Sequence, residues 1–351
     1  MTYRLNDKIR DLKPYDPITG NYRIRLDANE SFIPVPDTVM SKILEAVSLT
    51  EYNRYPDSKA SELCSQFAAY YHINARNVTA GNGSDELISV ICNAFLMKDD
   101  VMLTVSPDFS MYKFYSSICE TKCIEYQKKP DLTIDVDELI LTANEHNVKM
   151  ILFSNPCNPT SLGLKKADVR RLIDSVKALV VVDEAYMDFW NESLLTEAED
   201  YDNLIILRTC SKAFGMAGIR LGFAVANEAL TNALKAVKSP YNVNALTQKI
   251  GSILLNEHEL TQSSIAKIIA SKNQLYSEME RIESSHKGQM HVYPSVVNFI
   301  LVQLEEAKEM YQSLLNAGIA VRFMGDFLRI TAGTREENAE LIKKFEAAIL
   351  I

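Results

Sequence analysis

The chain has 351 residues, of which 47% are hydrophobic, and it carries a net charge of −9 at pH 7. This hydrophobic fraction is typical of globular proteins and excludes a disordered chain. The acidic balance argues against a surface that binds nucleic acid or an anionic membrane. No apolar stretch approaches the ~18 residues that a membrane-spanning helix needs. Because the chain exceeds the usual size of one hydrophobic core, we expect two domains.

The cysteines and the first residues indicate a compartment. Met1–Asp7 contain no apolar signal core, and the six cysteines form neither a CxxC pair nor a metal-type cluster with histidine. Cysteines in apolar or helical stretches behave as small buried hydrophobic residues. We therefore expect a reduced, cytoplasmic protein without a metal site.

Residues 1–35 are rich in Pro, Asp and Tyr and predict an arm that packs with the smaller domain. In residues 36–260, short apolar runs alternate with helical patterns such as Lys165–Val176. This alternation favours right-handed crossovers and an α/β fold with a mostly parallel central sheet flanked by helices. The expected strands are Val101–Val105, Lys122–Tyr126, Met150–Ser154, Leu179–Val182, Leu204–Leu207 and Gly222–Ala226.

Residues 261–351 change in character and predict a smaller α+β domain. A long helical stretch at Thr261–Ile282 precedes strand-like segments at Val296–Val302 and Phe327–Thr331. The chain ends in an expected helix, Arg335–Ile349, which Thr334 and Glu337 would start as a capping box.

Polar residues gather where the large-domain strands end, at Asn155–Gly163, Asp183–Tyr186 and Thr209–Lys212. In parallel sheets, ligands bind beyond the carboxyl ends of the strands. The pattern therefore predicts one binding site at this edge of the sheet.

Lys212 is the most informative residue of this edge. It lies just after an apolar strand, between hydroxyl residues and the later Arg220, so it could be held near a phosphate while its amine is partly desolvated. A neutral amine can form a Schiff base with an aldehyde. The alternative is a solvated loop lysine, which is what most lysines are.

Asp183 and Asn158 follow two other expected strands. A buried carboxylate is costly unless it is paired, and the protonated ring nitrogen of an electron-withdrawing cofactor would be a suitable partner for Asp183. A helix N-cap is the alternative. Two X-Pro steps fix the turn that carries Asn158, whose amide could reach a ring oxygen, although a turn by itself is a weak signal.

Two further segments have residues suited to anions. Gly81–Glu86 begin a helix with Ser84 as its expected N-cap, and glycines before a helix N-terminus expose N–H groups that bind phosphate. The run matches neither the P-loop nor the dinucleotide fingerprint, and an ordinary capped helix has the same pattern. Arg329 lies in the strand pattern Phe327–Thr331, where it could grip a carboxylate or phosphate or simply face water.

Together these motifs resemble those of the fold-type I aminotransferases that use pyridoxal 5′-phosphate (PLP), and more narrowly the histidinol-phosphate aminotransferases. The resemblance covers nearly the whole chain. It includes Pro14-Tyr15, Leu26–Glu30, Tyr52–Asp57, Gly81–Glu86, Asn155–Thr160, Val181–Phe189, Leu207–Gly222, Asn298-Phe299, Gly318–Arg322 and Leu328–Asn338.

The resemblance implies a role for each residue around the cofactor. Lys212 would form the Schiff base and move a proton, and Asp183 would pair with the pyridine nitrogen. Asn158 and Tyr186 would hydrogen-bond the ring's 3′-oxygen, and Phe109 would stack on the ring. The residues implied at the cofactor phosphate are Ser84, Asp85, Thr209, Ser211, Arg220 and, from a neighbouring subunit, Tyr55, so a homodimer is implied.

The resemblance also implies the reaction. Histidinol phosphate and 2-oxoglutarate would become imidazole acetol phosphate and glutamate, as a step of histidine biosynthesis. Arg329 would receive the α-carboxylate of glutamate or the phosphate of histidinol phosphate in turn, with Arg322, Tyr15 and Asn29 also at the substrate.

The sequence departs from the family pattern in three places: Phe109 replaces a frequent tyrosine, Ser161 stands where glycine usually follows the threonine, and the loop between Arg322 and Arg329 is short. Three alternatives stay open: an aromatic amino-acid aminotransferase, a threonine-phosphate decarboxylase, and a binding module of the same fold that has lost catalysis. The last is disfavoured because all the chemically required residues are present.

Overall fold

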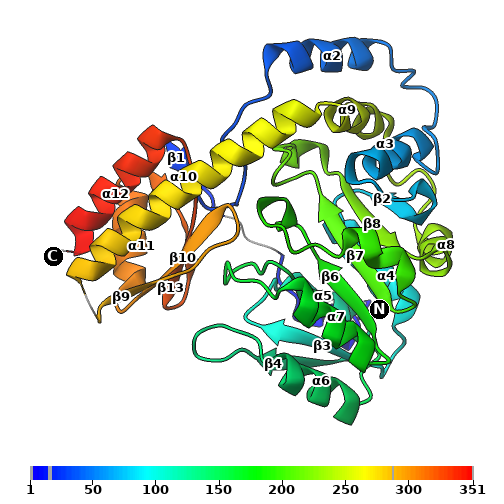
Figure 1. Cartoon of the computed structure of the whole chain (residues 1–351), viewed down its shortest axis with the longest axis horizontal. Helices are drawn as coiled ribbons and strands as arrows, with labels where there is room; N and C mark the ends of the chain where they lie inside the picture. The colour runs from blue at the N-terminus through cyan, green and yellow to red at the C-terminus, as the bar shows by residue number, and fades with distance from the viewer. Residues whose placement is uncertain (1–2, 15–17, 287, 350–351) are drawn as a thin grey trace.

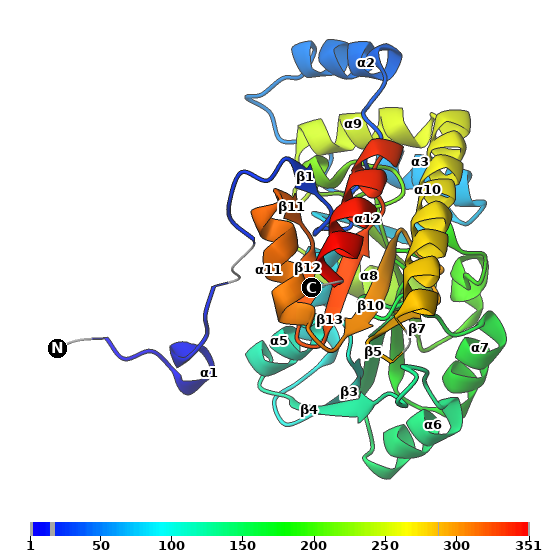
Figure 2. The same cartoon turned by 90° about the vertical axis from the view of Figure 1, so that its left-hand side faces the viewer.

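The computed structural model describes residues 3–14, 18–286 and 288–349 (Figures 1 and 2). A large sheet and a small sheet form two layered units side by side, and the long helix α10 (His258–Ser285) runs along both. Residues 265 and 268 of α10 lie in the core of the large unit, whereas residues 275, 279 and 282 lie in the core of the small one.

The large sheet has seven strands in the order β2-β8-β7-β6-β5-β3-β4. Only β8 runs antiparallel to its neighbours, so the expected mostly parallel sheet is confirmed. Its strands are β2 (Val78–Gly81), β3 (Val101–Ser106), β4 (Lys122–Gln127), β5 (Met150–Ser154), β6 (Leu179–Asp183), β7 (Leu204–Thr209) and β8 (Gly222–Ala226).

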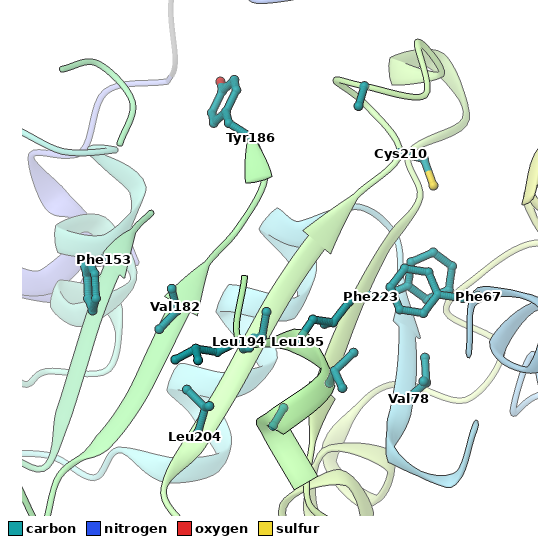
Figure 3. Packing of buried hydrophobic residues seen from close by; sticks show 14 of the residues in the cluster. Phe67, Val78, Phe153, Val182, Tyr186, Leu194, Leu195, Leu204, Cys210 and Phe223 are labelled. Atoms are coloured by element: carbon teal, nitrogen blue, oxygen red, sulfur yellow. The ribbon is translucent and has the colours of Figure 1, made fainter. Parts of the chain in front are cut away.

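Both faces of the central strands β5, β6 and β7 are buried, which explains why these strands are nearly continuous in apolar residues. Alternate residues of each strand belong to different cores: Ile151 and Val180 face one core, while Leu152 and Val181 face the other. Figure 3 shows part of the first core, where the rings of Phe67 and Phe223 stack with centroids 3.9 Å apart.

Helices cover the two faces of the large sheet. Those that pack on the first core are α2 (Asp37–Ser48), α3 (Ser61–Tyr71), α6 (Val136–Glu145), α7 (Lys166–Ser175), α9 (Ala245–Leu255) and the first half of α10. Those that pack on the second core are α4 (Ser84–Phe95), α5 (Met111–Ile118) and α8 (Glu228–Val237). None of the helices in the described parts of the chain is long and apolar enough to cross a membrane.

The small unit contains an antiparallel sheet of four strands in the order β12-β13-β10-β9. Its strands are β9 (Met290–Tyr293), β10 (Phe299–Leu304), β12 (Arg322–Met324) and β13 (Phe327–Thr331), and its helices besides α10 are α11 (Ala307–Asn316) and α12 (Arg335–Ile349). These elements share one apolar core, as an α+β unit requires.

The N-terminal segment touches both units. The short strand β1 (Ile24–Arg25) pairs in parallel with β11 (Ile319–Ala320) of the small unit. The helical turn α1 (Asp7–Arg10) instead lies against α5, where Lys8 Nζ donates to Ile118 O at 3.0 Å. The domain boundaries at residues 35 and 260 stay a prediction.

Two of the expected helix starts can be checked against hydrogen bonds. The capping box before α12 is confirmed, because Thr334 N donates to Glu337 Oε2 and Glu337 N donates to Thr334 Oγ1. The expected cap of α4 was wrong: Ser84 is the first residue of that helix and Gly83 is the N-cap, at φ +86°. Glycine adopts this left-handed conformation without steric cost.

Candidate active site

Lys212 lies three residues after the end of β7, in the segment that leads to the reversed strand β8. Its side chain is partly buried, and Nζ donates to Ala28 O at 3.0 Å. The same Nζ lies 5.8 Å from the centre of the Tyr186 ring, beyond the end of β6. Strand β7 thus delivers an amine between the N-terminal segment and the neighbouring strand end.

Asp183 ends β6 and is buried, with 5% of its surface exposed. Its carboxyl accepts hydrogen bonds from Tyr112 Oη at 2.9 Å and from Ala185 N at 3.1 Å. Burial raises the pKa of Asp183 to about 7, because these neutral donors do not offset the cost of removing a carboxylate from water. A ligand cation next to this carboxyl would restore its charge.

Tyr186 stands beyond the end of β6, above the core residues of that strand (Figure 3). Asn29 Nδ2 donates to its hydroxyl at 2.9 Å. Thr331 Oγ1 in turn donates to Asn29 Oδ1 at 3.1 Å, and Asn298 Nδ2 donates to Asn29 O at the same distance. Asn29 therefore joins the small sheet to Tyr186 and leaves the phenol proton to be donated elsewhere.

Arg329 of β13 reaches the turn after β5. Its Nη1 donates to Asn158 Oδ1 at 2.5 Å, and its Nη2 donates to Asp27 O at 2.6 Å. This contact occupies the amide oxygen of Asn158 and leaves the NH₂ group to donate to a ligand. The guanidinium and the amide come from different units, so the site lies between them.

Arg322 is directly opposite Arg329 in the pairing of β12 with β13. The short loop noted in the sequence is a two-residue hairpin turn, Gly325-Asp326, between the paired residues Met324 and Phe327. Gly325 has φ +70°, which the first central residue of a type II′ turn requires. Because paired residues share one face of a sheet, this tight turn brings two guanidinium groups to the same face.

The residues expected at a phosphate also meet. Arg220 Nη1 lies 3.4 Å from Ser211 Oγ, which in turn lies 3.0 Å from Thr209 Oγ1. Arg220 Nη2 is 4.0 Å from Asp85 Oδ2, in the first turn of α4. The N–H groups of Ser84 and Asp85 have no partner inside the helix, because they belong to its first turn.

Two glycines, Gly222 and Gly83, leave space for these residues expected at a phosphate. A Cβ on Gly222 would lie 2.4 Å from Ser84 N, and a Cβ on Gly83 would lie 2.9 Å from Arg220 Nη2. The first contact is with backbone, so the start of α4 lies this close to β8 because residue 222 has no side chain, whereas the arginine end near Gly83 could move aside.

Two other expected site residues, Phe109 and Tyr55, contact aromatic rings. Phe109 lies edge-on to Tyr112, with ring centroids 5.5 Å apart. Tyr55 is 80% exposed and stacks on Tyr241 at the surface. Tyr15 lies outside the described residues.

Ser161 adopts the left-handed conformation at φ +61°, which explains why glycine is common at this position. Its hydroxyl donates to Pro294 O at 2.8 Å, and its carbonyl oxygen accepts from Val296 N at 3.1 Å. The serine thus ties the turn after β5 to the segment before β10, a contact that a glycine could make only in part.

Sequence reasoning missed the groups that surround the acidic segment. Tyr112, which is fully buried and donates to Asp183, lies on α5 three residues after Phe109. Behind the segment, Arg208 places Nε 3.1 Å from Glu184 Oε2 and Nη1 2.8 Å from Asp188 Oδ1. A basic residue directly after the apolar run of β7 was the one signal of this network.

Comparison with known proteins shows the family to which the chain belongs. The model of the family "Aminotransferase class I and II" matches residues 23–345. The chain belongs to this family. It is therefore an aminotransferase.

Among curated proteins, the chain is 42% identical over 339 residues to the histidinol-phosphate aminotransferase of Clostridium novyi, covering 95% of this chain and 94% of that one. Among solved structures, it resembles histidinol-phosphate aminotransferase from Sinorhizobium meliloti in complex with pyridoxal-5′-phosphate, with a TM-score of 0.88, 20% identity and coverage of 99% and 98%. L-threonine-O-3-phosphate decarboxylase from Porphyromonas gingivalis shares the fold, with a TM-score of 0.80, 22% identity and coverage of 93% and 100%. These two structures support the fold alone.

Proposed function

We propose that this aminotransferase binds PLP and converts histidinol phosphate and 2-oxoglutarate to imidazole acetol phosphate and glutamate. The buried carboxyl of Asp183 carries the cofactor assignment, because its pKa is raised to about 7 and its hydrogen bonds come from neutral donors. The protonated pyridine nitrogen of PLP would supply the cationic partner that would keep this carboxyl ionised. The likeness to the Clostridium novyi protein supports the choice of substrate.

The residues of the site fit the parts of PLP. When bound, the cofactor supplies an aldehyde and an electron-withdrawing ring. Arg220, Ser211, Thr209 and the first N–H groups of α4 would hold its phosphate. The NH₂ of Asn158 and the hydroxyl of Tyr186 would donate to its ring oxygen, and Phe109 would cover one face of the ring.

Lys212 would handle the proton of the reaction. Its Nζ is held by Ala28 O and lies near the ring of Tyr186. An amine in this position could take the proton from Cα of the donor and deliver it to the aldehyde carbon of the cofactor, C4′. Ala28 O, as a single neutral acceptor, can release the amine when substrate arrives.

Arg329 and Arg322 would bind the anionic group of each substrate. Two guanidinium groups on one sheet face suit both a carboxylate and a phosphate, because both anions accept paired N–H donors. The two substrates would occupy this site in turn, so a single anion site serves both halves of the reaction.

The cofactor assignment is tested with Lys212→Ala and the surface control Lys177→Ala. Purified wild-type protein and the control should be yellow and active with PLP, whereas Lys212→Ala should lose the visible absorbance and turnover. Wild-type protein that stays colourless after incubation with PLP would contradict the assignment.

The substrate is tested by single-turnover rates of the PLP-loaded enzyme with histidinol phosphate, phenylalanine and glutamate. We expect the highest kcat/KM with histidinol phosphate. A large preference for phenylalanine would instead identify an aromatic amino-acid aminotransferase. Release of CO₂ from threonine phosphate would identify the decarboxylase whose fold the chain shares.

We further propose that the enzyme works as a homodimer in which Tyr55 reaches the partner's cofactor phosphate. The surface around α2 and the segment after it is rich in exposed large apolar side chains, which indicates a protein interface. These side chains are Met40, Leu44, Leu49, Tyr52, Tyr55 and Tyr241. Figure 1 shows α2 along the outer edge of the molecule, where a second copy has access to it.

Subunit complementation tests this sharing. Lys212→Ala and Tyr55→Ala subunits are each expected to be poorly active. If Tyr55 serves the partner's site, a hybrid of the two variants contains one intact site and recovers activity on mixing. No recovery, although native mass spectrometry shows hybrid dimers, would place Tyr55 in its own subunit's site or outside any site.

A further inference from the structure

Three neighbouring strands of the large sheet, β5, β3 and β4, end beside a cluster of polar side chains to which the proposed reaction gives no role. The cluster consists of Lys128, just after β4, Asp108, just after β3, and Ser154 and Cys157, at and after the end of β5. It lies between the loop that carries Phe109 and the turn that carries Asn158.

Lys128 contacts both of these loops. Its Nζ donates to Pro107 O at 2.9 Å on one side and to Thr160 Oγ1 at 3.3 Å on the other. Cys157 Sγ lies 2.9 Å from the same nitrogen. These contacts use the three donors of the ammonium group.

Asp108 supplies the matching negative charge and extends the connection. Its carboxylate accepts from Phe109 N at 2.7 Å and from Ser154 N at 3.0 Å, and Ser154 Oγ also donates to it. Ser154 Oγ in turn accepts from Asn158 N at 3.2 Å. A continuous chain of hydrogen bonds therefore joins the backbone of Phe109 to the backbone of Asn158.

The charges of this cluster depend on each other. Burial raises the pKa of Asp108, and the charge of Lys128 is the largest effect that opposes the rise. A carboxylate removed from water needs a cation or several donors to stay ionised. Loss of the ammonium would therefore weaken the carboxylate's hold on Phe109 and Ser154 as well as the direct contacts of Lys128.

We propose that Lys128 is a positioning residue that fixes the Phe109 loop relative to the Asn158 turn. The inference rests on the proposed function, in which Phe109 covers the cofactor ring and Asn158 donates to its oxygen. The two groups come from different strand ends, so their separation sets the width of the ring pocket. Lys128 and the Asp108–Ser154 pair hold that separation without contacting the ring.

The test compares Lys128→Met with Lys129→Met in the PLP-loaded enzyme. Lys129 is a matched control, because its ammonium pairs with Asp135 at 2.8 Å on the surface, outside the cluster. We measure the dissociation constant of PLP by reconstitution, the visible circular dichroism of bound PLP, and kcat. Lys128→Met should raise the dissociation constant about tenfold and weaken the dichroism band, whereas Lys129→Met should match wild type.

Two further variants keep the test decisive. Lys128→Arg keeps a cation and should recover at least part of the PLP affinity, while Ser154→Ala breaks the chain to Asn158 and should weaken PLP binding even if Lys128→Met does not fold. A lower melting temperature with unchanged dissociation constant and dichroism in the folded variants would show a merely structural role and overturn the inference. Wild-type protein that binds no PLP would overturn the proposed function along with it.

Discussion

The two ends of the active site differ in their distance from water. At the ring end, Asp183 and Glu184 are at most 5% exposed, and Arg208 behind them is 4% exposed. At the phosphate end, the side chains of Arg220 and Asp85 are 47% and 45% exposed. Both ends carry charges, yet one is built inside the protein and the other at its surface.

In the proposed function, the difference follows from what each end has to do. A carboxyl that controls the protonation of a ring nitrogen acts strongly only where water does not screen it. Other buried charges close to it must then be paired with opposite charges, as Arg208 is paired with Glu184 and Asp188. A phosphate arrives from solvent already charged, so backbone N–H groups and an accessible arginine suffice.

The largest expected effect lies in the buried network at the ring end. Arg208→Met should lower the free energy of unfolding by about 3–5 kcal/mol, because Glu184 and Asp188 lose their cation. Chemical denaturation measures the change. The control is Arg170→Met, which breaks the more exposed pair with Glu197 and should leave the denaturation midpoint unchanged. Equal midpoints for the two variants would remove the distinction between buried and exposed charges.

Asp183→Asn should lower kcat about 100- to 1,000-fold, the usual cost of removing one preorganised electrostatic group. The amide keeps the size of the side chain but carries no charge for the ring nitrogen. Asp85→Asn, at the exposed end, should cost less than about tenfold, since water screens its charge. The rates are compared at saturating PLP, and similar losses would contradict the comparison.

Arg220→Met tests the phosphate end and should raise the dissociation constant of PLP about 10- to 100-fold, because a hydrogen bond to a charged group contributes about 1.5–3 kcal/mol. Added salt should weaken PLP binding in the wild type more than in the variant, since the exposed charge is screened. Arg76→Met, at an exposed pair with Glu228, is the control. Equal salt dependence in wild type and Arg220→Met would be evidence against the assignment.

Gly222→Ala should cost about 1–3 kcal/mol of stability and weaken PLP binding, because the new methyl group would displace the start of α4. Gly218→Ala is the matched control, since a Cβ at Gly218 meets no heavy atom within 4 Å. Thermal unfolding and PLP titration of both variants decide the matter. A Gly222→Ala protein with wild-type PLP affinity would show that the expected phosphate site does not depend on the position of the start of α4.

A further expected effect is a pH dependence of the cofactor-free protein. The pKa of Asp183 is raised to about 7 in the folded state, so folding favours the protonated carboxyl. This contribution to stability is complete below the unfolded pKa of about 3.9 and is lost as pH rises through about 7. Relative to Asp183→Asn, the wild type should lose up to about 1.4 kcal/mol per pH unit in this window. If the stability of the wild type and of Asp183→Asn changed with pH in the same way, this prediction would be contradicted.

Much of the large sheet could be predicted because its strands are buried on both faces. The bounds of β5 and β8 agree with the expected ones, since their apolar runs begin and end with the strand. Strand β2, of four residues, and the three-residue β12 were missed because so few residues show no periodicity. The misplaced cap at Ser84 has a local cause as well: the turn needs a positive φ, which Gly83 supplies.

The sequence by itself determined the chemical types and the edge where they gather. Lys212, Asp183 and Asn158 follow apolar strands, and parallel strands bring their carboxyl ends to one edge whatever the details of packing. The resemblance to aminotransferases added the expected roles, because the order of the motifs along the chain is specific even where each motif is weak.

Only the tertiary structure decided the partners. Tyr112 of α5 meets Asp183 at the end of β6, Arg329 meets Asn158 from the other unit, and a tight hairpin brings Arg322 opposite Arg329. Such contacts join residues far apart in sequence, and burial then sets their charge states. Local sequence patterns predict neither these contacts nor the charge states, because both depend on which surfaces the folded chain removes from water.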